Sequence, residues 1–225
     1  MAGLATLASR ALDLAFPAVC VGCGHEGAAV CVTCAPALDA RLHLPAGIPI
    51  GLPADLPEPL LQVEWCAPYA GLVRNALHAL KYGGERRLAV PLGAAIARRW
   101  TRAGAGGDLV VPVPVHRERA ARRGYDQAVL LAEHAARGLG LPMRPALRRD
   151  RATVAQFELD RQRRATNVAG AFGLASAGDA EAVAGRWVVL VDDVMTTGAT
   201  LAACAQALLE AGAAAVSAVT VARER

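Results

Sequence analysis

Two adjacent acidic residues and a hydroxyl-rich loop follow an apolar run near the end of this 225-residue chain. Residues 187–191 are apolar, and Asp192 and Asp193 come next; the loop then contains Thr196, Thr197, Gly198, Ala199 and Thr200. In open parallel sheets, ligands bind beyond the carboxyl ends of the strands, and the N–H groups at a helix N-terminus attract phosphate. Carboxylates repel phosphate, so we expect the acid pair to contact neutral hydroxyls or a metal-bound group beside it. The pattern predicts a sugar-phosphate site.

Other phosphate-binding motifs do not fit these residues. A P-loop needs Gly-x4-Gly-Lys-Ser/Thr, and Lys81, the only lysine of the chain, lies in no such motif. A dinucleotide-binding fold needs Gly-x-Gly-x-x-Gly after a strand, and none of the predicted strands is followed by this motif. The plainer alternative is a strand-to-helix turn with an acidic cap, and the full order of residues disfavours it.

Four cysteines form two Cys-x2-Cys pairs that are separated by seven residues: Cys20, Cys23, Cys31 and Cys34. Two such pairs complete a closed tetrahedral zinc site with no open coordination position, so we expect a structural role. Replacement of one ligand by His25, a redox dithiol and an iron–sulfur cluster remain alternatives. Cys66 and Cys204 have no partner at a ligand spacing, and we expect them in the core. So few cysteines, clustered in this way, favour a reducing cytoplasm.

Basic residues in the middle of the chain could neutralise a second anionic group. Pro112 and Pro114 interrupt an apolar run, and Arg117 and Arg123 follow in the next segment. Arginine forks suit a pyrophosphate, although a solvated helix face is an equal alternative for this segment alone. Lys81 lies two residues before a pair of glycines and could also contact the anion. The alternative is that Lys81 lies at the exposed end of a surface helix.

Strands alternating with helices must position these residues. Apolar runs predict strands at residues 61–69, 109–113, 171–174, 187–191 and 215–221, and helical spacing predicts helices at residues 72–80, 89–101, 127–137 and 200–210. This order predicts an α/β fold with a mainly parallel sheet that has helices on both faces. Recurring prolines mark residues 44–59 as a linker. We therefore divide the chain into an N-terminal helix and zinc module (1–43), the linker (44–59) and the main domain (60–225).

Charge and composition exclude several classes of protein. The hydrophobic share is 54% and the formal net charge is +4, which indicates a soluble globular chain with no membrane span and is too mild to establish a polyanionic partner. Basic residues concentrate in residues 117–164, where the arginine-rich part from 148 to 167 could be a lid over the site or a nucleic-acid surface. Aromatic residues make up 4%, which disfavours extensive base stacking; Tyr82 and Tyr125 are the candidates.

Several motifs taken in order resemble the ComF family (ComFC and GntX-like proteins). They are the cysteine pairs, Leu80-Lys81-Tyr82-Gly83, Pro112-Val-Pro-Val-His116, Arg122-Arg-Gly-Tyr-Asp-Gln127, and the acid pair with its threonine loop. The resemblance extends from Cys20 to the end of the chain. It implies a type I phosphoribosyltransferase-like fold with an N-terminal zinc finger. One departure is Tyr125-Asp126, where the family usually has Phe-Asn; the added carboxylate could pair with Arg122 or Arg123, or weaken anion binding.

The resemblance also implies roles for the site residues. The acid pair would hold the ribose hydroxyls of 5-phosphoribosyl-1-pyrophosphate (PRPP), and Thr196 to Thr200 would hold its 5-phosphate. Lys81, Arg117 and Arg123 would assist Mg²⁺ at the pyrophosphate. Some members of the family act in DNA uptake during natural transformation, which implies single-stranded DNA and uptake proteins as partners.

Three functions are therefore compatible with the sequence. The first is a phosphoribosyltransferase, a glycosyltransferase acting on PRPP, whose acceptor the sequence does not identify. The second is a PRPP-binding regulator without turnover. The third is a nucleic-acid-associated factor that uses the zinc module.

Overall fold

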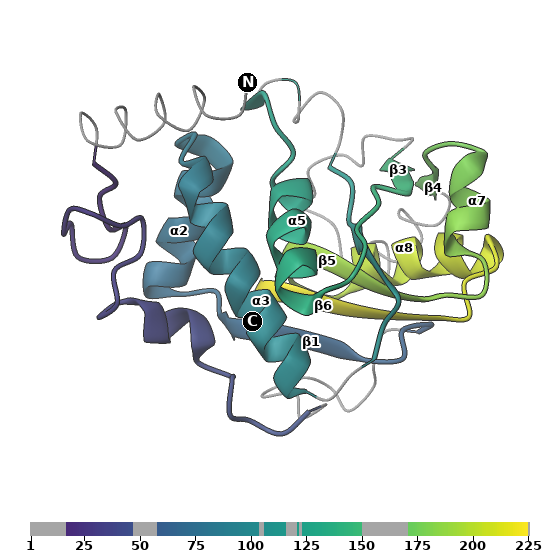
Figure 1. Cartoon of the computed structure of the whole chain (residues 1–225), viewed down its shortest axis with the longest axis horizontal. Coiled ribbons are helices and arrows are strands. Elements are labelled where there is room, and N and C mark those ends of the chain that lie inside the picture. Colours follow the sequence, from purple (N-terminus) through teal and green to yellow (C-terminus); the bar gives the residue numbers. More distant parts are fainter. Residues whose placement is uncertain are drawn as a thin grey trace.

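A sheet covered by helices forms the centre of the protein. The computed structural model describes residues 17–46, 58–103, 106–115, 121, 123–149 and 171–224 (Figure 1). In chain order the elements are η1 (Ala35–Asp39), β1 (Val63–Pro68), α2 (Gly71–Tyr82), η2 (Arg86–Leu88), α3 (Ala89–Arg102), β2 (Leu109–Pro112), α5 (Gln127–Leu139), β3 (Leu147–Arg149), β4 (Phe172–Leu174), α7 (Gly178–Val183), β5 (Trp187–Met195), α8 (Ala199–Glu210) and β6 (Ala215–Arg223).

The central sheet has the strand order β1-β6-β5-β2, and each neighbouring pair of strands is parallel. Its strands are rich in valine and other apolar residues, as is typical of strands buried on both faces. Strands β3 and β4 form a separate antiparallel pair. The prediction of a mainly parallel α/β sheet is confirmed.

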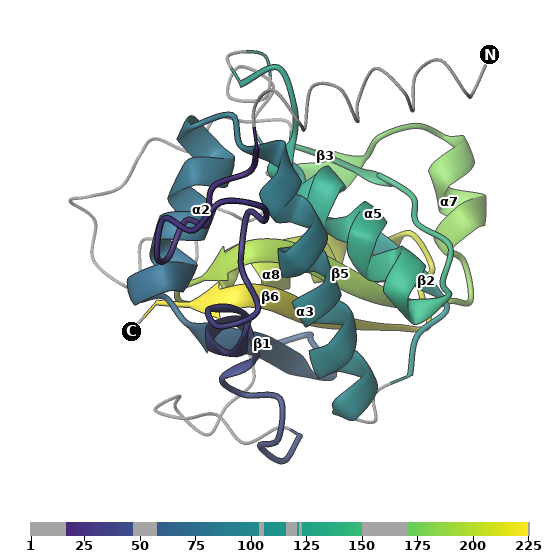
Figure 2. The ribbon, with the colours of Figure 1, turned by 60° about the vertical axis from the view of Figure 1, so that its left-hand side comes forward.

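Two hydrophobic cores lie on the two faces of this sheet. Because strand residues alternate between faces, Val189 and Val191 pack with α2, α3 and α5, whereas Val188 and Leu190 pack with α8. Figures 1 and 2 show the same division of the helices between the two faces. Helices on both faces were predicted, and they are present. None of the helices within the described ranges is long and apolar enough to cross a membrane.

Strand β5 is longer than the sequence indicated. The apolar run predicted a strand that ends at Val191, but pairing with β6 continues as far as Met195 opposite Arg223. Strand β6 is itself a long apolar strand, and its backbone pairs with β5 beyond Asp192 and Asp193. Asp192 and Asp193 therefore lie within a strand, and strand geometry directs their side chains to opposite faces. Four further short elements escaped prediction: η1, η2, β3 and α7, each of which is too short for a periodic pattern.

The buried Arg99 side chain fastens the N-terminal segment to the main domain. The Arg99 guanidinium of α3 lies 2.5 Å from Oε2 of Glu64 on β1, and the two side chains are 1% and 0% exposed. Arg99 also donates to the carbonyl oxygens of Arg41, Leu44 and Pro45 at 2.6, 2.7 and 3.2 Å. The chain that follows η1 is thus tied to the main sheet. The predicted linker, residues 44–59, is described only at its two ends, and the predicted N-terminal helix lies outside the described residues.

Candidate functional site

Lys81 and Asp193 form an ion pair at the carboxyl end of β5. The Lys81 Nζ atom lies 2.7 Å from Oδ2 of Asp193, and the side chains are 19% and 8% exposed. Lys81 belongs to the last turn of α2, so this helix brings the only lysine of the chain to the acid pair. Burial alone would lower the pKa of Lys81, but the charges of Asp193 and Asp192 outweigh burial, and the pKa is raised. Lys81 is therefore held as a cation.

Asp192 has a different environment from its neighbour. Its pKa is well above the usual range, because burial and then the charge of Asp193 disfavour its ionised form. Its Oδ1 atom accepts a hydrogen bond of 2.7 Å from the Asp193 N–H. Strand alternation directs Asp192 to the face of α8, whereas Asp193 faces α2 and α5. One carboxylate of the pair is therefore neutralised by a cation, and the other is repelled by its neighbour.

The loop between β5 and α8 combines hydroxyls with a helix N-terminus. Thr196 and Thr197 are exposed, and Thr200 is half-buried in the first turn of α8. Gly198 directly precedes the helix with a φ of 81°, a left-handed conformation that a side chain would strain. The first N–H groups of a helix have no acceptor within that helix, so they can bind an anion. The predicted phosphate-binding loop therefore has suitable geometry.

Gln127 connects the acid pair to Arg123 and was missed by the sequence reasoning. Its Nε2 atom lies 3.4 Å from Oδ2 of Asp193, and its Oε1 atom accepts a hydrogen bond of 2.6 Å from Arg123. The side chain is only 4% exposed. A signal was present in the sequence: Gln127 shares one helical face with Leu131 and Ala135, both buried, so it is a polar residue at a core position.

Asp126 caps helix α5; Arg122, one of the two partners expected for its carboxylate, lies outside the described residues. Its side chain accepts hydrogen bonds from the N–H groups of Ala128 and Val129 at 2.8 and 3.3 Å. It also accepts a longer bond of 3.4 Å from the Val115 N–H. Asp126 therefore acts as a helix N-cap, and the partner of Arg123 is Gln127. Burial raises the pKa of Asp126, although these N–H groups oppose the rise.

A pocket brings together several of the predicted site residues, and we call it the acid-pair pocket. It is lined by Lys81, Tyr82, Val113, Pro114, Val115, Arg123, Gln127, Arg149, Asp192, Asp193 and Thr200. Thr196, Thr197 and Gly198 lie in the adjoining loop and Ala199 begins α8, but none of the four lines the pocket itself. Arg117 lies outside the described residues, as does most of the arginine-rich segment from 148 to 167.

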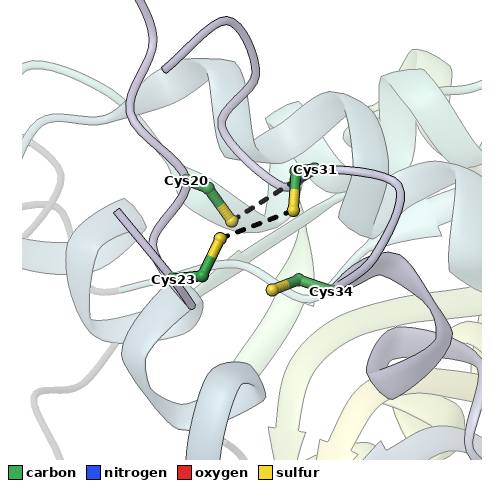
Figure 3. Close-up of side chains that lie close together, drawn as sticks. All are labelled: Cys20, Cys23, Cys31 and Cys34. Carbon is green, nitrogen blue, oxygen red and sulfur yellow. Dashed lines mark hydrogen bonds between the residues drawn. The ribbon is translucent and has the colours of Figure 1, made fainter. Parts of the chain in front are cut away.

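The two cysteine pairs meet in space, as their spacing predicted. Figure 3 shows the four thiols turned toward a common centre. All four Sγ atoms lie within 4.8 Å of one another, and the Sγ atoms of Cys23 and Cys31 are 3.6 Å apart. Within the described part of the chain this group contains cysteines alone; His25 instead accepts a backbone hydrogen bond of 2.8 Å from Cys20. The donor set and its closure fit a structural tetrahedral ion.

Hydrogen bonds and mutual repulsion give the four thiols unequal acidity. The Cys31 N–H donates to Cys20 Sγ at 3.3 Å and is the main reason that the pKa of Cys20 falls to about 6. The pKa of Cys34 rises to about 12, chiefly because it interacts with the Cys31 thiol. A cation bound between the four sulfur atoms would neutralise their charges and so stabilise all four as thiolates. Cys66 and Cys204 are buried in the cores, as predicted, and burial raises the pKa of both thiols.

The cysteine module packs directly on the helix that carries Lys81. A Cβ atom at Gly22 would lie 2.4 Å from Cδ1 of Leu72 in α2 and 2.9 Å from Sγ of Cys34. Leu38 of η1 is 1% exposed and belongs to the core beneath α2 and α3. The module and the acid-pair pocket therefore lie at the two ends of one helix.

Known proteins are similar to this chain in sequence. The family described as Phosphoribosyl transferase domain matches residues 126–225. Across 225 aligned residues the chain is 34% identical to DNA utilization protein YhgH of Escherichia coli (strain K12), covering 90% of this chain and 96% of that protein. It is 39% identical over 95 residues to Competence protein F of Haemophilus influenzae, covering 42% and 41% of the two chains. A solved glutamine phosphoribosylpyrophosphate (PRPP) amidotransferase from B. subtilis aligns with a TM-score of 0.41 at 22% identity, covering 60% of this chain and 27% of that chain, which is too slight to carry an argument.

Proposed function

This chain belongs to the ComF family, which includes DNA utilization protein YhgH and Competence protein F, and on that premise we propose that it binds PRPP in the acid-pair pocket and serves the uptake or use of DNA. The DNA part of the proposal comes from the names of these relatives. The PRPP part is supported by the pocket. We further propose that the protein works in the cytoplasm, where its six cysteines stay reduced.

The observation that supports PRPP binding most is the acid pair, one carboxylate of which is paired with Lys81, beside the helix start at Gly198. The 5-phosphate would lie at the first N–H groups of α8 and the threonine hydroxyls. Ribose hydroxyls would donate to Asp192 and Asp193. Lys81 and Arg123 border the same pocket and would contact the pyrophosphate; Arg117 is assigned there by the sequence alone.

We propose that bound PRPP is turned over by phosphoribosyl transfer. A nucleophile would form a bond to the anomeric carbon of the ribose, and the bond from that carbon to the pyrophosphate oxygen would break. The pyrophosphate would leave with the electron pair, so cations around it favour the transition state. Mg²⁺ would supply further charge neutralisation at this leaving group. A regulator that binds PRPP without turnover is the alternative within the same pocket.

Thermal unfolding tests PRPP binding. We expect PRPP with Mg²⁺ to raise the melting temperature of the wild type by mass action. In a variant with both Asp192→Asn and Asp193→Asn, the shift relative to that variant's own melting temperature should disappear. Glu181→Gln is a matched control, since Glu181 is exposed on α7 and does not line the pocket. A full shift in the double variant would contradict the assignment of the acid pair.

A screen for released pyrophosphate separates the candidate functions. PRPP would be offered with nucleobases, with nucleotides and with single-stranded DNA. Release with one of them identifies an enzyme and its acceptor class. Binding of PRPP without release favours the regulator, whereas binding of DNA without binding of PRPP favours the nucleic-acid factor.

We propose that the cysteine cluster holds one structural zinc ion per chain. Cys20, Cys23, Cys31 and Cys34 would each contribute a thiolate, and the ion would fold a segment that has little core of its own. Metal analysis of purified protein should find zinc in a one-to-one ratio. A stoichiometric iron chromophore, or protein folded without metal, would contradict this assignment.

A further inference from the structure

Gln127 is a buried polar side chain that lies between two charged groups of the acid-pair pocket. It lines the pocket, is 4% exposed, and contacts Arg123 on one side and Asp193 on the other. Burying an amide is costly unless it is hydrogen-bonded, so a glutamine at this place indicates that the contacts themselves have a role. That role is not to cap the helix, because Asp126 already caps α5.

The two ends of the Gln127 amide match the charges on either side of it. Its Oε1 atom, an acceptor, lies 2.6 Å from Nη1 of Arg123, and its Nε2 atom, a donor, lies 3.4 Å from Oδ2 of Asp193. The reverse orientation would set N–H groups against the guanidinium and an oxygen against the carboxylate. The amide therefore has one orientation, and it is a neutral group between a cation and an anion that attract each other.

This contact also determines which oxygen of Asp193 is engaged. Lys81 Nζ lies 2.7 Å from Oδ2, the same oxygen that Gln127 Nε2 contacts. Both contacts of the carboxylate with side chains of the described residues are thus to Oδ2. The other oxygen, Oδ1, is the acceptor to which a ribose hydroxyl would donate.

Arg123 is fixed by two contacts in the same way. Its guanidinium donates to Gln127, and its guanidinium carbon lies 5.0 Å from the ring centroid of Tyr82. Gly124, with a φ of 71°, turns the chain between Arg123 and α5. A guanidinium has five N–H donors in a planar fork, so anchoring one of them on Gln127 sets the direction in which the others point.

We propose that Gln127 is a positioning residue for PRPP, which keeps Arg123 apart from Asp193 and holds the guanidinium toward the pyrophosphate and the carboxylate toward the ribose. This inference rests on the proposed function and adds to it the residue that orients the two binding groups. Gln127 acts through its two neighbours rather than through the ligand.

Calorimetric titration with two ligands tests this role. PRPP and ribose 5-phosphate share the ribose and the 5-phosphate, and they differ by the pyrophosphate. Each would be titrated with Mg²⁺ into the full-length protein, with ribose 5-phosphate measured by competition against PRPP. The ratio of the two dissociation constants reports on the pyrophosphate contacts alone. A substitution that only lowers stability would move both constants together and leave this ratio unchanged.

Two substitutions of Gln127 separate its two contacts. Gln127→Met has a similar length but no polar end, so Arg123 loses its anchor. The preference of this variant for PRPP over ribose 5-phosphate should fall about 3- to 10-fold, since binding must then immobilise one more flexible side chain. Gln127→Glu keeps an acceptor for Arg123 but repels Asp193, so it should weaken both ligands and keep the ratio of the wild type.

A matched control and a folding check make the comparison specific. Gln206→Met changes an exposed glutamine of α8 that donates to Glu210 at 2.8 Å, and it should keep the ratio of the wild type. Methionine favours helix and suits a buried position, so Gln127→Met should fold, which circular dichroism would check. If it does not fold, Gln127→Glu still decides, because a lowered ratio in that variant contradicts the proposal.

The failures of the two proposals are distinguishable. If the wild type binds PRPP but folded Gln127→Met keeps its ratio, the positioning role is overturned and PRPP binding stands. Ribose 5-phosphate that does not compete with PRPP in the wild type would also overturn this role, because Asp193 would then hold no ribose by itself. If PRPP does not bind the wild type, the proposed function itself fails.

Discussion

Replacing the two adjacent aspartates one at a time should move stability in opposite directions. In Asp193→Asn, Lys81 loses the carboxylate that lies 2.7 Å from its ammonium group, in a setting where the side chains are 19% and 8% exposed. In Asp192→Asn, the substitution removes a group whose ionised form is disfavoured by burial and by Asp193. An amide oxygen at residue 192 can still accept the hydrogen bond from the N–H of residue 193. The first change should therefore destabilise the protein, and the second should stabilise it.

The magnitudes follow from the burial of each group. Removing one partner of a fully buried ion pair costs about 3–5 kcal/mol, and partial exposure of Lys81 reduces this to about 1–3 kcal/mol for Asp193→Asn. Asp192→Asn removes the cost of burying a carboxylate and its repulsion by Asp193, which should contribute on the order of 1 kcal/mol. Since 1 kcal/mol shifts the melting temperature of a chain of this size by about 2–4 °C, the two variants should melt on opposite sides of the wild type.

The assay is thermal and urea unfolding followed by circular dichroism at two pH values. The folded-state pKa of Asp192 is raised, so its destabilising effect is present above that pKa and is lost as the pH falls toward the ordinary value of 3.8. The advantage of Asp192→Asn should therefore be present at about pH 7 and shrink at about pH 4.5. Equal destabilisation by both substitutions, or a gain that persists in acid, would refute the reasoning.

Substitutions at three further positions probe separate parts of the molecule. Gly22→Ala should loosen the metal cluster, measured as faster zinc loss to a chelator, because the new Cβ would lie 2.4 Å from Leu72 Cδ1. Asp126→Ala should lower the free energy of unfolding by about 1 kcal/mol through loss of the helix cap, whereas Asp126→Asn keeps an acceptor and should not. Gln127→Glu adds a third carboxylate beside Asp193, so urea unfolding should show a loss of about 1 kcal/mol near pH 7 that diminishes in acid.

Sequence reasoning reached the residues whose chemistry depends on local spacing. The cysteine pairs are short-range patterns, and the glycine of the threonine loop has the positive φ that a turn into a helix requires. The alternation of strands and helices could be predicted equally well, because each element has its own hydrophobic period.

Contacts between distant segments could not be predicted in this way. The Lys81–Asp193 pair joins α2 to β5, and no local pattern specifies that distance. Gln127 bridges two charged residues from a helix whose other inward positions are apolar. The true end of β5 depends on the length of β6, its partner in the ladder. Such features are set by packing, which single-sequence patterns do not encode.

The Arg99 anchor makes the cysteine module and the main sheet one cooperative unit. Separating them would remove the Arg41 guanidinium, which lies 3.7 Å from Oε2 of the fully buried Glu64 on β1. It would also take from Arg99 three carbonyl acceptors at once. A single unfolding transition is therefore expected for the whole chain. Removal of the proposed zinc ion should then also destabilise the distant threonine loop, and a chelator titration would report on global folding.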